Sequence, residues 1–153
     1  MNEINRIRDQ LLKSFEGGAW YGPSVLETLE GVSYEQASVR PVNNAHTIAE
    51  LALHIKAWQN ITRIRLEGNA FDASPADDWP EVNIASEKEW ALEIEKLKES
   101  FKLLSESISK SNEAKLDYAA AGQNYSNYFM LHGLIQHNAY HAGQITLLKK
   151  ALG

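Results

Sequence analysis

The last long segment of the sequence, from Tyr128 to Leu152, keeps one helical period without a break. At about 100° per residue, its inward positions fall within an arc of less than about a third of the helix circumference. That arc consists of Met130, Leu134, His137, His141, Ile145, Leu148 and Leu152. Because an apolar stripe of this kind faces a core, the segment predicts a long helix that carries two histidines, one turn apart, into the interior.

The N-terminal part predicts shorter helices. Apolar residues at helical spacing predict a first helix from Ile4 to Phe15, which the pair Gly17-Gly18 ends. A short second helix follows, with Pro23 expected at its first helical position. Ser33 then predicts the cap of one more short turn, over residues 34–37.

Two capping-box patterns mark the starts of the long helices in the middle of the chain. Thr47, followed three residues later by Glu50, precedes an apolar-periodic run that we expect to end at Gly68. Ser86, followed by Glu89, precedes a second run of the same kind. Each pattern predicts that the serine or threonine side chain caps the helix while the glutamate bonds back to the cap.

The segments between these helices are polar and aperiodic. Residues 68–85 are rich in Ala, Asp, Asn and Pro, and a connection of this length suits a crossover that spans the body of a bundle. A second polar break covers residues 111–127. No internal repeat or alternating strand pattern is present. The sequence therefore predicts an all-α fold, a four-helix bundle with an additional short helix after the first, in a single domain spanning residues 1–153.

Composition excludes several classes of protein. The chain has no cysteine, so thiolate metal sites and disulfides are impossible, and any metal must rest on imidazole, carboxylate or water. A net charge of −5 and the lack of a basic stripe argue against a nucleic-acid partner. No apolar run is long enough for a signal peptide or a membrane span, which predicts a cytoplasmic protein without a membrane partner.

A third histidine is predicted to point inward from the helix that begins after Thr47. His54 falls on the helix face that carries the apolar residues, while polar and charged residues of this helix lie outside that face. The apolar set is Ile48, Leu51, Ile55, Trp58, Ile61 and Leu66, and the outer set is Lys56, Gln59, Asn60 and Arg63. Burial of three imidazoles without a shared partner is costly, so the pattern points to one site.

The spacing of the histidines indicates a metal site. His137 and His141, four residues apart on a helix, can bind one ion from one face, and His54 can supply a third ligand from a facing helix. Three neutral imidazoles leave open positions for water or substrate, as in catalytic sites. A bound water would then be acidified towards neutral pH. The alternative is that these are hydrogen-bonded core histidines with no metal.

Other polar residues have weaker assignments. Asn138 stands where HExxH metalloproteases carry their glutamate base, which argues against that class of protease. Glu50 is a candidate base or a candidate hydrogen-bond partner of a metal ligand, or simply part of the cap. Gln144 is a candidate contact to a metal ligand or to the substrate, or forms an interhelical hydrogen bond. We interpret His46 and His132 as structural or solvated, and the tryptophans as packing residues.

Three stretches of the sequence resemble a known family. GGAWYGPS, HTIAELALHIKAWQ and LIQHNAYHAGQITLLKK, in this order, are similar to the DinB-like superfamily, which includes the YfiT-type proteins grouped as metal-dependent hydrolases. The resemblance covers essentially the whole chain. It implies an up-down-down-up bundle, homodimers, and a divalent ion such as nickel or zinc bound at the positions of His54, His137 and His141.

The reaction implied by the resemblance is less specific. Relatives include thiol S-transferases that use low-molecular-weight thiols such as bacillithiol, and a mycothiol-dependent isomerase. We therefore expect a metal-dependent hydrolase or thiol S-transferase acting on a small molecule, with a metal-bound water or thiolate as the nucleophile. The alternative is a stress-related bundle that binds a metal or small molecule without turnover, and a third is a purely structural bundle that self-associates. The catalytic residues, the metal and the substrate stay open.

Overall fold

The computed structural model describes residues 1–153, and all of its regular elements are helices. In chain order the helices are α1 (Glu3–Phe15), α2 (Val25–Leu29), α3 (Tyr34–Ser38), α4 (Ile48–Leu66), α5 (Pro75–Asp78), α6 (Glu87–Lys110), the 3-10 helix η1 (Glu113–Asp117) and α7 (Asn127–Leu152). The only β feature is an isolated bridge between Ala119 and Ser126. None of the helices combines the length and the apolar character that crossing a bilayer needs.

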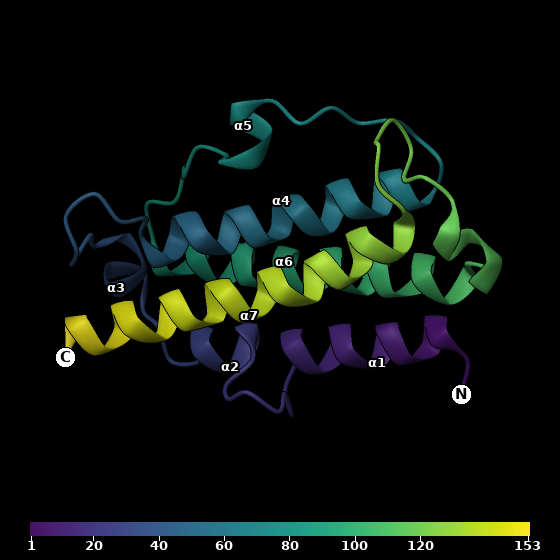
Figure 1. The fold of residues 1–153 in the computed structure, drawn as a ribbon. Helices are drawn as coiled ribbons and strands as arrows, with labels where there is room; N and C mark the ends of the chain where they lie inside the picture. Colours follow the sequence, from purple (N-terminus) through teal and green to yellow (C-terminus); the bar gives the residue numbers. More distant parts are fainter.

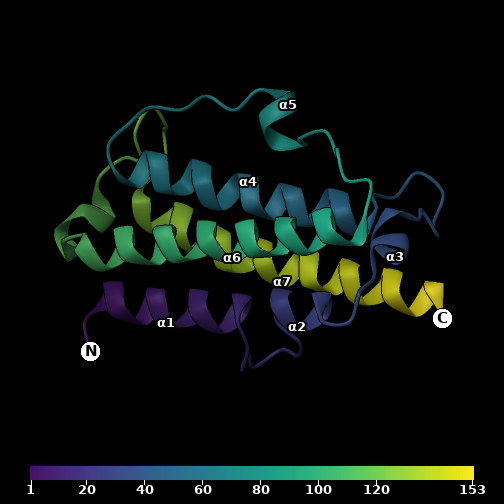
Figure 2. The same cartoon turned by 180° about the vertical axis from the view of Figure 1, so that it is seen from behind.

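Four helices form the bundle. In Figure 1, α1 and α7 run in one direction while α4 and α6 run in the opposite one, which is the up-down-down-up order. The short α2 continues α1 in line, as the additional helix after the first. Because α4 and α6 are parallel, the chain must return along the whole bundle between them, and the crossover that carries α5 does so along the outside of α4 (Figures 1 and 2). The predicted fold is confirmed.

Most helix starts follow the sequence signals. Both halves of the capping box at Thr47 and Glu50 are formed, with N–H to O distances of 3.1 Å and 2.7 Å. At α6, Ser86 accepts from the backbone of Glu89, but the Glu89 carboxylate accepts from the N–H of Ala85, so only half of that box is present. The polar break before α7 ends at Ser126, which caps that helix.

One expectation about the early helices needs correction. Pro23 is not the first residue of a helix, because Ser24 caps α2 through a complete capping box with Glu27 and so places the proline before the cap. The short turn expected to contain residues 34–37 is present as α3, which Ser33 caps as predicted.

The core lies between the four long helices, α1, α4, α6 and α7, all of which contribute buried apolar side chains. On α7, Met130, Leu134, His141, Ile145 and Leu148 are buried as predicted, but so are residues on other sides of the helix, namely Leu131, Asn138 and Ala142. On α4 the expectation that Gln59 lies outside the buried face is wrong. Its side chain is fully buried and accepts a hydrogen bond from Ser100 of α6. A helix covered by neighbours on several sides has no polar face to mark its orientation.

Candidate metal centre

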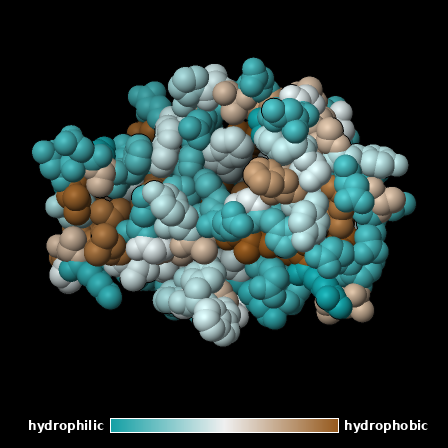
Figure 3. Space-filling model, in the orientation of Figure 1, coloured by the Kyte–Doolittle hydropathy of each residue, from teal (hydrophilic) through white to brown (hydrophobic).

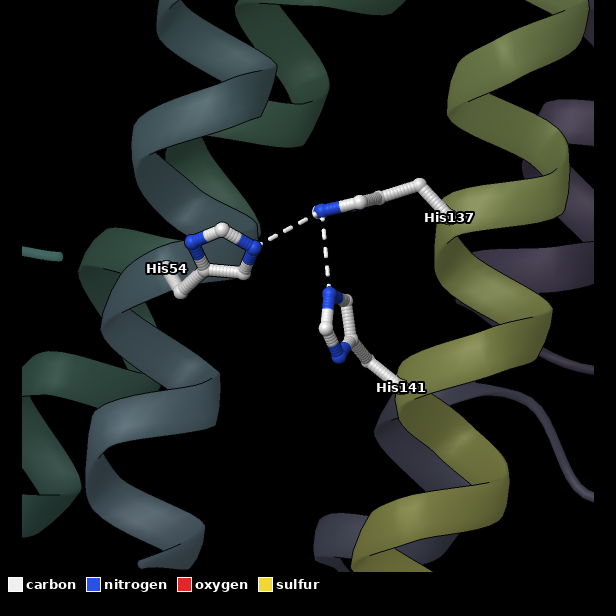
Figure 4. A group of neighbouring side chains, drawn as sticks. All are labelled: His54, His137 and His141. Atoms are coloured by element: carbon white, nitrogen blue, oxygen red, sulfur yellow. Dashed lines mark hydrogen bonds between the residues drawn. The ribbon is translucent and has the colours of Figure 1, made fainter. Parts of the chain in front are cut away.

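The three predicted histidines meet in the space between α4 and α7 (Figure 4). His54 projects from α4, and His137 and His141 project towards it from α7. The Nε2 atom of His137 lies 2.9 Å from Nε2 of His54 and 3.0 Å from Nε2 of His141. His54 and His141 are buried and His137 is half-buried. The three residues therefore form one group, although His54 and His137 are separated by 83 residues in the sequence.

His54 is held from behind by the crossover. Its Nδ1–H donates to the backbone carbonyl of Asp78 at 2.6 Å, and the Asp78 carboxylate lies 3.3 Å from the same nitrogen. The indole of Trp79 stacks on the His54 ring with centroids 3.8 Å apart and planes 6° apart. Because the outer nitrogen is bound to an acceptor, the inner Nε2 must carry a lone pair and no proton.

His141 is fixed in the same way by a residue on its own helix. Its Nδ1 lies 2.5 Å from Oε1 of Gln144, one turn further along α7. The Nδ1–H therefore donates to the amide oxygen, and Nε2 again presents a lone pair to the group. Nδ1 of His137 is different, because it is buried and has no hydrogen-bond partner.

Hydrogen bonds alone cannot satisfy these nitrogens. A neutral imidazole has one N–H, and His54 and His141 use theirs on oxygen acceptors outside the group. Only the N–H of His137 remains for two N···N contacts. On Nε2 this proton can point directly at only one of the two partners, and on Nδ1 it leaves lone pairs facing one another in both contacts. A cation that accepts all three lone pairs removes this conflict. Nitrogens about 2.1 Å from one ion are about 3.0 Å apart at a right angle and about 3.4 Å apart at the tetrahedral angle. The two contacts to His137 fit this range, and all three ligand nitrogens lie within 4.8 Å of one another.

The electrostatics of the group keep its imidazoles neutral. Burial, followed by the neighbouring His141 and His54, lowers the pKa of His137 to about 3. Burial also lowers the pKa of His54 and of His141, against the opposing effects of the Asp78 carbonyl and of Gln144 respectively. Neutral imidazole is the form that binds a metal ion.

The other candidate residues lie outside the group. Glu50 is engaged at the start of α4, where its carboxylate accepts from the backbone of Thr47 and from Arg40 at 2.7 Å and 2.8 Å. His46 lies 3.3 Å from Glu50 and stacks on the far face of Trp79, with centroids 3.5 Å apart. His132 packs against the ring of Tyr128.

Asn138 faces away from the histidines. It is fully buried, and its amide nitrogen donates to Ser14 of α1 at 3.0 Å. The residue that follows His137 therefore joins α7 to α1 and is not positioned as a general base.

Sequence reasoning missed the contribution of the crossover. Asp78 is the last residue of a helical turn, α5, and Trp79 follows it; the turn begins with a complete capping box between Ser74 and Asp77. That Ser-Pro-x-Asp pattern was a detectable local signal for a helix start. The residues next to this pattern give no indication that the helical turn lies against His54.

A cavity of about 250 Å³ adjoins the group at His137. It lies between α4 and the first half of α7, and it also touches Tyr125 before α7. The histidine group is therefore next to a space large enough for part of a small molecule.

Comparison with known proteins gives one match. The family model described as the DinB superfamily matches residues 23–145, a range that includes all three histidines of the group. No curated protein and no solved structure matches the chain.

Proposed function

The chain belongs to the DinB superfamily, and from that premise we propose that it is a metal-dependent enzyme whose His54, His137 and His141 bind one divalent ion through Nε2. The observation that carries the proposal is the convergence of three Nε2 atoms that have too few protons to bond one another. Nickel and zinc are the expected ions, because imidazole suits both. Three protein ligands leave open positions for a substrate.

The residues around the group have identifiable roles in this proposal. The carbonyl of Asp78 and the amide oxygen of Gln144 hold His54 and His141 in the tautomer that a metal ion requires. The indole of Trp79 covers the ring of His54 and excludes water from that side. When bound, the ion would lower the pKa of a water or thiol that occupies an open position.

Thiol S-transfer to a small electrophile is the favoured reaction, with hydrolysis as the second. The candidate carboxylate bases are both engaged. Asp78 accepts from the Trp58 indole and lies beside Nδ1 of His54. Glu50 belongs to a helix cap and binds Arg40. A thiol loses its proton far more readily than water does, so it depends less on a general base. The expected cosubstrate is therefore a low-molecular-weight thiol. The rival is a bundle that binds a metal or small molecule without turnover.

We further propose that the chain acts as a homodimer. Tyr140 and Leu147, seven residues apart on α7, are 66% and 65% exposed. The two side chains lie on one exposed face of the helix, and this supports an interface there. The molar mass in solution, measured by light scattering, tests this point, and a monomer at all concentrations would contradict it.

Metal content tests the main proposal. Untagged protein dialysed against nickel or zinc should retain about one ion per chain, and His137→Ala and His141→Ala should retain little. His132→Ala is the matched control, because His132 lies on the same helix outside the group. Wild type that retains no metal would overturn the proposal.

Activity distinguishes the enzyme from its rival. A screen of thiol and electrophile pairs, with esters and amides beside them, should reveal turnover that chelation abolishes. Metal binding without any turnover would favour the non-catalytic bundle.

A further inference from the structure

The cavity beside His137 has an almost entirely apolar lining. Its walls are Trp58 and Thr62 of α4, Tyr125 from the segment before α7, and Phe129, Met130, Gly133, Leu134 and His137 of α7. No carboxylate, ammonium or guanidinium group is among them. Figure 3 shows apolar side chains at the surface over the region where α7 begins in Figure 1. A charged group that enters such a cavity would lose its hydration without gaining a charged partner, so binding it there would be unfavourable.

The aromatic walls are fixed at their polar ends. The indole N–H of Trp58 donates to the carboxylate of Asp78 at 2.7 Å, and the hydroxyl of Tyr125 accepts from Arg65 at 2.7 Å. The Arg65 side chain is itself buried and donates to the carbonyl of Phe71. These bonds hold the two rings in place while their apolar parts line the cavity, so the cavity is largely formed before a ligand arrives.

The cavity is accessible and open to the histidine group. Phe129 lines it and is 65% exposed, so the cavity opens to solvent at this residue. His137 lines its inner end. Gly133 lines it beside open space, because a Cβ built at this position meets no atom within 4 Å, so a larger side chain there has room to extend into the cavity. A ligand that enters past Phe129 therefore reaches the nitrogens of the group.

From this geometry we infer that the cavity is the subsite for the uncharged, apolar part of the substrate, a group about the size of a phenyl ring. The inference rests on the proposed function, in which the reacting atom of the substrate lies beside His137. An apolar cavity of about 150 Å³ is enough to bind benzene, and this one measures about 250 Å³. The electrophile of the reaction is therefore an aryl or alkyl compound, and its charged parts must lie outside the cavity.

Methionine provides a direct probe of the cavity. The chain has two methionines: Met130 lines the cavity, while Met1 is 84% exposed and distant in sequence. Protein labelled with ¹³C at the methionine methyl groups is titrated with 4-phenylimidazole and, for comparison, with 4-methylimidazole, both without metal and with zinc. The ring of a bound phenyl group should shift the methyl signal of Met130 and leave that of Met1 unchanged.

The expected preference is large. Removing a phenyl ring from water should make 4-phenylimidazole bind zinc-loaded protein about ten- to a hundredfold more tightly than 4-methylimidazole. Gly133→Leu fills the cavity and should abolish both the preference and the Met130 shift. Gly143→Leu is the matched control, because Gly143 lies on the same helix, is exposed and does not line the cavity. This variant should keep both effects.

The outcomes separate the inference from the proposed function. If the protein holds zinc but shows no preference for the phenyl ligand, or if Gly133→Leu leaves the preference intact, the subsite is wrong and the metal centre stands. If the protein holds no zinc, the proposed function fails, and the metal-free titration still decides the subsite: a Met130 shift that Gly133→Leu removes supports it, and the absence of a shift overturns it.

Discussion

The acid sensitivity of the metal-free protein depends on His137. The folded protein keeps this side chain neutral down to its lowered pKa of about 3, whereas the unfolded chain binds the proton below the ordinary value of 6.5. Because the unfolded state binds more protons below pH 6.5, the free energy of unfolding decreases as the pH falls below that value. At pH 5.0, 1.5 units below 6.5, the loss from His137 alone is about 2 kcal/mol.

Replacement of His137 by glutamine removes this loss. The lowered pKa values of His54 and His141 act in the same direction and remain in the variant. In EDTA, between pH 7.5 and 5.0, wild type should therefore lose about 2 kcal/mol more stability than His137→Gln, as measured by urea unfolding followed by circular dichroism. His132→Gln, on the same helix outside the group, should behave as wild type does. Equal losses in wild type and His137→Gln would refute the burial of a neutral imidazole.

Three other changes have outcomes that follow from the contacts. With free zinc at about a hundred times its Kd, removing the zinc should lower the free energy of unfolding by about 2.7 kcal/mol. In a thermal melt, EDTA should therefore lower the Tm by about 5–10 °C. Asp78→Ala removes the acceptor of the Trp58 indole and the carboxylate near His54, so metal affinity measured against a coloured chelator should fall about tenfold, with Asp78→Asn nearer to wild type. Gln59→Met removes a buried amide nitrogen without a partner, and Ser100 retains its bond to a backbone carbonyl, so urea unfolding should show up to about 1 kcal/mol of added stability.

Signals that act within a few residues predicted much of the fold. The capping box at Thr47 and the inward stripe of α7 depend only on helical geometry, and both are present. Pro23 was misplaced because a serine cap at the next residue outweighed the preference of proline for a first helical position. Gln59 was misplaced for a different reason, because a single polar face is a poor guide in a helix surrounded by neighbours.

In the candidate site too, residues placed by local helical geometry could be predicted and those placed by distant contacts could not. The meeting of His54 with His137 and His141 could be predicted, because helical spacing fixes the direction of each side chain and a bundle brings inward faces together. Asp78 and Trp79 could not be placed, because they come from an aperiodic crossover whose path depends on contacts distant in sequence. Two residues that orient the site therefore lie in the crossover, the segment whose sequence has no periodic pattern from which to predict its path.

The two sides of the histidine group differ in what they admit. On one side the stacked rings of His46, Trp79 and His54 form a continuous aromatic layer, with centroid separations of 3.5 Å and 3.8 Å. No molecule fits between rings at that spacing, so the face of His54 that Trp79 covers is closed to a ligand. On the other side His137 lines the apolar cavity, which reaches solvent at Phe129. An ion held by the group would be shielded on the crossover side and reachable between α4 and α7. The crossover would then orient the ligands, while the cavity would select the substrate.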